Sequence, residues 1–100
     1  MDIAKVTLVT LIAAFELEDR LVADLRSLGV NAYTVGRVGG RGEHGTRIPG
    51  LADAPNLRIE MLVHRDLSRN ILRAVATSYV DQPVIAYVQE VEAVPAAHFA

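Results

Sequence analysis

Alternating apolar and polar residues predict the strands of this chain. Residues Leu57–His64 (LRIEMLVH) have an apolar side chain at every second position, and the two-residue period of a strand puts these on one face and Arg58 and Glu60 on the other. Ala4–Ile12 (AKVTLVTLI) is rich in β-branched residues and apolar on both faces, as in a buried strand. Two further strands are predicted at Val30–Val38 (VNAYTVGRV) and Val84–Val91 (VIAYVQEV).

The period changes to that of a helix in two segments. Leucines recur every three or four residues within Phe15–Leu28, which places them on one helical face, and Gly29 supplies a left-handed exit. A second helix is predicted from an N-cap at Asp66 to about Tyr79, before Pro83. Its predicted buried residues are Leu67, Ile71, Ala74, Val75 and Ser78.

The predicted order of elements is β-α-β-β-α-β, the ferredoxin-like arrangement of an α+β domain. A chain of 100 residues suffices for one such domain, so we expect residues 1–100 to form a single unit. Two helices cover only one face of a four-stranded sheet, and the first strand carries apolar residues on the other face as well. We therefore expect a homo-oligomer that buries the open face.

Composition narrows the class of function. The chain is 51% hydrophobic and 22% charged with a net charge of -2, which is typical of a globular domain and disfavours general nucleic-acid binding. The lack of cysteine excludes disulfides, zinc–thiolate sites and thiol nucleophiles. The apolar start is preceded by Asp2, followed by Glu16 and too short to span a bilayer. It predicts a strand, not a signal peptide, and hence a cytoplasmic protein.

A glycine-rich stretch, Gly39–Asn56, separates the second and third predicted strands. It contains GRGEHG, which matches G-x-G-x-x-G, but the dinucleotide fingerprint also requires a helix starting within the motif, and none is predicted. Glycine backbone amides, together with Arg37, Arg41 and Arg47, are suited to binding phosphate or carboxylate. The same composition is typical of a solvated surface loop, so both interpretations stay open.

No catalytic or metal-binding constellation is recognisable. The histidines lack the spacing of metal ligands, and the serines lack a nucleophile-elbow context. These observations disfavour an enzyme and a metal site. The strand Leu57–His64 carries none of the aromatic residues on which RNA-recognition domains stack bases. Tyr33, Tyr79 and Tyr87 are interpreted as core or interface residues.

Several segments together resemble the PII signalling family. Phe15 with Leu17-Glu18-Asp19 resembles the opening of that family's first helix. Tyr33–Val35 followed by Val38–Gly42 resembles its second strand entering the long T-loop, and Pro55–Val63 resembles its third strand. The resemblance covers roughly residues 6–80. It implies a trimer of β-α-β-β-α-β subunits that binds adenine nucleotides between subunits, with a T-loop at about residues 39–56.

The resemblance also implies where ligands bind. Thr34 and the backbone near Leu62 would contact the adenine, and the base of the T-loop would surround the sugar and phosphates. The predicted nucleotide-binding residues are Thr34, Gly39, Gly40, Arg41, Gly42, Glu60, Leu62 and Arg65. A second group, predicted to contact phosphate or a second ligand, comprises Arg37, His44 and Arg47.

Departures from the family pattern refine the predicted ligand. Thr77–Pro83 has none of the glycines and lysine of the family's phosphate loop, and Gln89–Pro95 has none of its arginines. These departures argue against ATP, Mg²⁺ and 2-oxoglutarate, and a T-loop without tyrosine argues against uridylylation. The chain is most similar to the PII-like proteins of bicarbonate uptake and carboxysome gene clusters. That similarity implies AMP, ADP or cyclic AMP as the nucleotide, of which AMP or ADP is predicted here, with bicarbonate as a second ligand and no metal.

The leading functional prediction is a non-catalytic sensor whose T-loop presents a surface to a partner protein, such as a bicarbonate transporter or a carboxysome component. Two alternatives stay open. One is a small ferredoxin-like enzyme, such as a cofactor-independent monooxygenase or isomerase, and the other is a structural oligomer with an inert loop. Ligand binding separates the three, because a ligand specific for the folded state raises its stability. The tail, Pro95–Ala100, has no predicted element or role.

Overall fold

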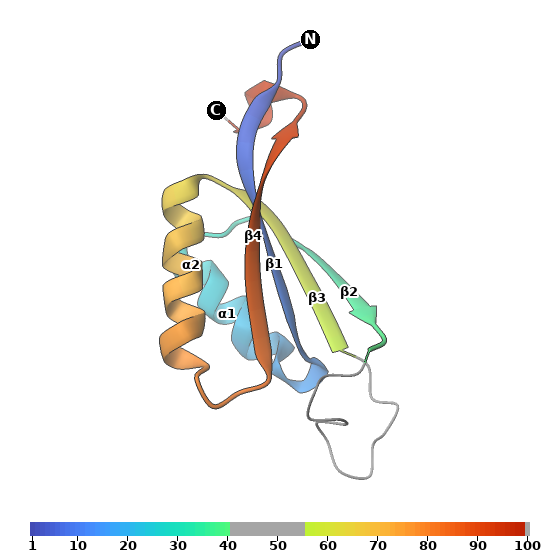
Figure 1. The fold of residues 1–100 in the computed structure, drawn as a ribbon, viewed down its shortest axis with the longest axis vertical. Coiled ribbons are helices and arrows are strands. Elements are labelled where there is room, and N and C mark those ends of the chain that lie inside the picture. The colour runs from blue at the N-terminus through green and yellow to red at the C-terminus, as the bar shows by residue number, and fades with distance from the viewer. Residues whose placement is uncertain (41–55, 100) are drawn as a thin grey trace.

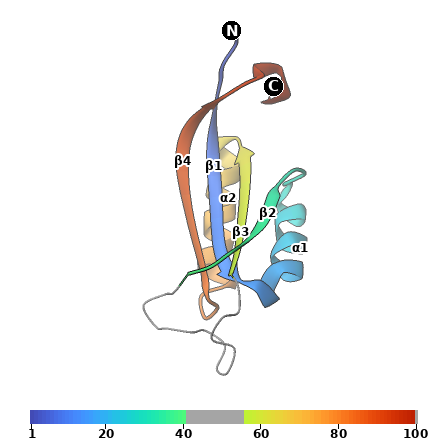
Figure 2. The same ribbon diagram turned by 90° about the vertical axis from the view of Figure 1, so that its right-hand side faces the viewer.

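The structure, a computed structural model, describes residues 1–40 and 56–99. They form a four-stranded sheet of order β2-β3-β1-β4, in which all neighbouring strands are antiparallel. Two α-helices cover one face of this sheet (Figure 1, Figure 2). In chain order the elements are β1 (Ala4–Ala14), the 3-10 turn η1 (Phe15–Leu17), α1 (Glu18–Leu28), β2 (Thr34–Val38), β3 (Asn56–Val63), α2 (Arg65–Ser78), β4 (Val84–Ala93) and the 3-10 turn η2 (Ala96–Phe99). The predicted ferredoxin-like fold is confirmed.

The hydrophobic core lies between the sheet and the two helices. Its buried residues include Val9, Leu11 and Ala13 of β1, Ile59 and Met61 of β3, Leu21 and Leu25 of α1, and Ile71 of α2. The alternation predicted for the third strand is confirmed, because its apolar set is buried whereas Arg58 and Leu62 are exposed. The apolar faces of the strands and of the helices thus pack against each other in one core.

The second strand begins later than predicted. β2 starts at Thr34 and not at Val30, and its ladder with β3 ends at the pair Thr34–Glu60. The reason lies at the end of α1, where Gly29 is left-handed with a φ of 107° and the Val30 N–H donates to the Leu25 carbonyl at 3.0 Å. This turn buries the Val30 side chain in the core, so the residues that follow connect α1 to β2 without pairing.

The start of α2 also differs from the prediction. Asp66 lies inside the first turn, and His64 occupies the N-cap position without a side-chain capping bond. On the buried face, Ser68 is 1% exposed, whereas Ser78, which was predicted to be buried, is exposed. The Ser68 hydroxyl donates to the Arg65 carbonyl at 2.6 Å, and this bond allows a polar side chain to be buried.

A polar cluster joins the two helices at the C-terminal end of α2. The Tyr79 hydroxyl donates to Asp24 Oδ2 at 2.6 Å, and the Arg20 guanidinium lies 4.4 Å from the centroid of the Tyr79 ring. Arg20 also donates to the Ser78 carbonyl at 3.1 Å. Burial and the neighbouring Asp24 raise the pKa of Tyr79 to about 12. Tyr79 is 4% exposed, so its predicted core position is confirmed, and its bonds tie α2 to α1.

The β1–β4 pair extends beyond the helices (Figure 1). β4 runs two residues further than predicted and pairs with β1 as far as Ala4–Ala93. The turn η2 follows, contacts β1 and gives the tail a structure that its sequence did not predict. Among the described helices, none is long and apolar enough to cross a membrane.

The sheet face away from the helices carries exposed apolar side chains. Leu62 is 40% exposed, Ile85 64% and Tyr87 43%. The strand register places Leu62 beside Leu8 of β1 and Ile85 beside Ile12, so these residues form one apolar surface, which we call the open face. No described element covers it, as expected for a sheet with both helices on its other side.

Candidate functional site

A cavity of about 240 Å³ lies where β3 continues past the end of β2. We call it the β3-edge cavity. It is lined by Val6, Gly29, Val30, Asn31, Ala32, Leu62, Val63, His64, Leu67, His98 and Phe99. Its volume lies below the range of about 300–1,000 Å³ that is typical for complete drug-sized ligands, so it is sized for one planar ring system and not a whole nucleotide.

The β3-edge cavity follows from the late start of β2. Because the ladder ends at Thr34–Glu60, residues Met61–Val63 have no described strand beside them on that side. An unpaired strand edge presents backbone N–H and C=O groups. The remaining walls combine aliphatic side chains with the polar Asn31, His64 and His98 and the ring of Phe99. A flat ligand would therefore meet apolar surfaces and one hydrogen-bonding edge. The predicted contact at the Leu62 backbone lies at this edge.

The residues that flank the predicted T-loop meet at the other end of β3. Val38 pairs with Asn56, and a Cβ built on Gly40 would lie 3.7 Å from Asn56 Nδ2. Asn56 is 6% exposed, and its Oδ1 accepts no hydrogen bond from residues 1–40 and 56–99. A buried acceptor without a donor costs stability, so this atom is a candidate contact for a ligand.

The structure divides the candidates on β2 and β3 between two sheet faces. Thr34 and Glu60 are register partners and lie with Leu62 on the open face. Arg37 is the register partner of the buried Leu57 and lies on the helix side, with its guanidinium 6.0 Å from the centroid of the Phe15 ring. Thr34, Glu60 and Leu62 are thus brought together, and Arg37 is held across the sheet from them.

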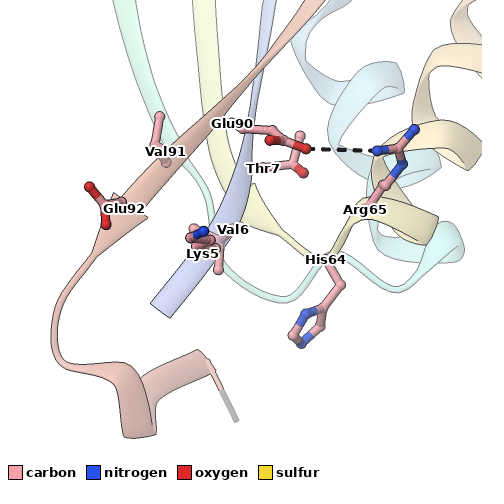
Figure 3. Close-up of a pocket in the computed structure, with 8 residues that line it drawn as sticks. All are labelled: Lys5, Val6, Thr7, His64, Arg65, Glu90, Val91 and Glu92. Carbon is pink, nitrogen blue, oxygen red and sulfur yellow. Dashed lines mark ion pairs between the residues drawn. The ribbon is translucent and has the colours of Figure 1, made fainter. Parts of the chain in front are cut away.

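Arg65 lines a second cavity, of about 470 Å³, at the start of α2 (Figure 3). Its Nη1 atom lies 3.7 Å from Glu90 Oε1, and both side chains are largely exposed. An exposed pair of this kind contributes about 0–1 kcal/mol, so it restrains Arg65 only weakly. Lys5 and Glu92, register partners on β1 and β4, also line the cavity, so its charges of opposite sign are balanced.

The predicted nucleotide-binding residues do not form one site within a single chain. Thr34 and Gly40 are six residues apart. At the rise of an extended chain this separation is about 20 Å. Leu62 and the β3-edge cavity lie at one end of β3, and the loop base lies at the other. Arg41, Gly42, His44 and Arg47 lie outside the described residues.

Sequence reasoning missed part of the candidate site. It assigned no role to Asn56, Ala32, His98 or Phe99. The only signal for Asn56 was a polar residue at the first position of an apolar alternation, and the tail is too short to show a period.

In residues 1–40 and 56–99 there is no group of three or more side chains that could hold a metal ion.

Comparisons of the sequence and the structure with known proteins identify the family of this chain. The family model described as nitrogen regulatory protein P-II matches residues 6–97. Among curated proteins, none matches the sequence. A solved structure described as a PII-like signalling protein, from Thermus thermophilus, is 33% identical over 100% of both chains, with a TM-score of 0.81.

Two more distant structures share the fold. CPII from Thiomonas intermedia K12, bound to ADP and bicarbonate, is 18% identical, with a TM-score of 0.82 over 99% of this chain and 98% of that one. A DUF3240 family protein from Shewanella baltica is 20% identical, with a TM-score of 0.68 over 86% of this chain and 89% of that one. The family match and the Thermus relative together show that this chain belongs to the nitrogen regulatory protein P-II family, among its divergent PII-like members.

Proposed function

We propose that this protein is a non-catalytic, cytoplasmic PII-like regulator that senses AMP or ADP. The observation that carries the proposal is the β3-edge cavity, which matches the size and chemistry of a purine base. The edge of adenine that carries its amino group offers one donor and one acceptor, and the unpaired side of β3 at Leu62 offers the complementary backbone groups. Aliphatic walls suit the faces of the ring.

The phosphates would bind at the base of a T-loop. Gly39 and Gly40 end beside Asn56, and the predicted cation, Arg41, follows them directly. Because the cavity and the loop base lie at opposite ends of β2 and β3, one nucleotide would take its base contacts from one copy and its phosphate contacts from another. The site thus needs an oligomer, and the apolar open face supplies a surface for the proposed homotrimer.

Bicarbonate is proposed as a second ligand at the loop base. Asn56 supports this assignment, because its buried Oδ1 lacks a described donor and its amide nitrogen can donate. Bicarbonate carries one hydroxyl donor and several acceptor oxygens, which an amide can match. CPII of Thiomonas intermedia was solved with ADP and bicarbonate bound. Asn56→Asp would place a carboxylate against the anion and should abolish any effect of bicarbonate on ADP affinity.

The proposed output is control of a partner protein through the T-loop, with a bicarbonate transporter or a carboxysome component as the partner class. The nucleotide would contact both the rigid cavity and the loop base. It would therefore bind more tightly to loop conformations that complete the site than to those that do not. It would therefore shift the population of loop conformations that the partner recognises.

Thermal-shift and calorimetric titration with AMP, ADP, ATP and GMP test the proposal. We expect AMP and ADP to bind at least as tightly as ATP, with no requirement for Mg²⁺, and GMP to bind more weakly. A clear preference for Mg²⁺–ATP, or no adenine nucleotide binding at millimolar concentration, would contradict it.

A variant pair tests the cavity itself. Ala32→Trp places an indole in the β3-edge cavity from an exposed position, so it should abolish AMP binding while the fold is retained. Ala97→Trp is the matched control, since Ala97 is exposed on η2 and does not line the cavity. Equal AMP affinity in the two variants would mean that the base binds elsewhere.

A further inference from the structure

The C-terminal turn η2 closes one side of the β3-edge cavity. His98 and Phe99 line the cavity, and the His98 N–H donates to the Pro95 carbonyl at 3.1 Å to form the turn. The turn contacts β1, whose Val6 lines the same cavity. The last two residues of this turn, His98 and Phe99, therefore form one wall of the cavity.

Phe99 differs in kind from the other side chains of the cavity. Most of those are aliphatic, Asn31 and His64 are polar, and Phe99 is the one phenylalanine, tyrosine or tryptophan among the residues that line the cavity. The His98 and Phe99 rings lie 5.0 Å apart at an interplanar angle of 80°. Two perpendicular rings form a corner, in which a planar ligand can stack on one ring and meet the edge of the other.

Phe99 is only partly buried, so its ring lines the cavity without filling it. We propose that η2 is a specificity element of the nucleotide site, in which Phe99 stacks on the adenine and His98 orients the Phe99 ring. This proposal rests on the proposed function and adds the tail to it. Stacking of a base on an aromatic side chain is worth about fivefold to 150-fold in affinity.

The contact is with the base, and this gives the proposal a signature that a phosphate contact lacks. Removal of the Phe99 ring should weaken the binding of adenosine and of AMP by the same factor, because both ligands carry the same base. Removal of a phosphate contact such as Arg41 should weaken the binding of AMP and leave the affinity for adenosine unchanged. The ratio of the losses in affinity for adenosine and for AMP therefore distinguishes a Phe99 variant from an Arg41 variant.

The experiment is calorimetry of adenosine and AMP with the full chain and the variants Phe99→Leu, Phe99→Tyr and His98→Ala. Phe99→Leu should lose about fivefold to 150-fold for both ligands, Phe99→Tyr should keep most of the affinity, and His98→Ala should show a smaller loss. Val94→Ala is the control, because Val94 is 56% exposed ahead of the turn and does not line the cavity.

The outcomes distinguish this proposal from the one on which it rests. Wild-type protein that binds neither AMP nor ADP would overturn the proposed function and the role of η2 with it. Wild-type protein that binds AMP, with Phe99→Leu binding equally well, would overturn the role of η2 alone. A Phe99→Leu variant with lower affinity for AMP but unchanged affinity for adenosine would also overturn the role of η2, because the ring would then act on the phosphate end of the nucleotide.

Discussion

Removal of the Tyr79 hydroxyl tests the link between the two helices. Tyr79→Phe deletes the bond to Asp24, which is 2.6 Å long, and leaves the ring under Arg20 in place. Because the acceptor is a carboxylate, the bond belongs to the charge-assisted class, and its loss should cost about 1.5–3 kcal/mol of unfolding free energy. Urea denaturation at fixed protein concentration measures this difference, since association with other copies also contributes to stability.

The same variant makes a prediction about pH. The pKa of Tyr79 is about 12 in the folded protein, against 10.0 for an unperturbed tyrosine. A raised folded pKa means that the protonated form is favoured by folding, so the stabilisation is fully present below pH 10 and is lost as the pH rises to 12. The stability difference between wild type and Tyr79→Phe should shrink across this window.

The control is Tyr33→Phe, which removes a hydroxyl from a residue that is 38% exposed in the connection between α1 and β2. Its effect should stay within about 0.5 kcal/mol, as for most surface changes. A Tyr79→Phe effect as small as that of the control, or one that is constant from pH 8 to pH 12, would refute the reasoning.

Three further predictions concern the fold, the assembly and the loop. Gly29→Ala should destabilise the protein by about 1–2 kcal/mol, because Gly29 has a φ of 107°, whereas Gly36→Ala, with open space around its Cβ position, should be close to neutral in the same denaturation experiment. Ile85→Lys puts a charge on the open face and should convert the proposed trimer to a monomer, as measured by light scattering. The control Val80→Lys, at a position that is 73% exposed in the α2–β4 turn, should leave the measured mass unchanged. Arg41→Ala should weaken AMP by about tenfold to a hundredfold in calorimetry, as for loss of a charge-assisted bond, and unchanged affinity would remove Arg41 from the phosphate site.

The sequence predicted the fold well where one period dominated. In β3, Ile59, Met61 and Val63 face the core, whereas Arg58, Glu60 and Leu62 face away from it, so alternation alone located the strand and both its faces. In α1, the leucine spacing and Gly29 located the helix and its end, although Phe15–Leu17 forms a 3-10 turn and not α-helix. The resemblance to the PII family, drawn from dispersed short segments, was also correct.

The sequence was least informative where tertiary contacts override local pattern. Val30 is β-branched and apolar, as in a strand, but its N–H bonds to the Leu25 carbonyl of α1 and its side chain fills the core, so β2 starts four residues later. That displacement opens the β3-edge cavity, which no local pattern could reveal. The lining by His98 and Phe99 depends on where β4 ends, and the separation of Leu62 from Gly40 depends on strand direction. Both are properties of the folded sheet.

A crystal structure of the protein with AMP tests the central claim most directly. We predict that the adenine ring occupies the β3-edge cavity, with its edge hydrogen-bonded to the backbone at Leu62 and one face against Phe99. The phosphate should lie at the T-loop base of a second copy, beside Gly40. AMP bound in the cavity beside Arg65 and Lys5, with the β3-edge cavity empty, would contradict the account.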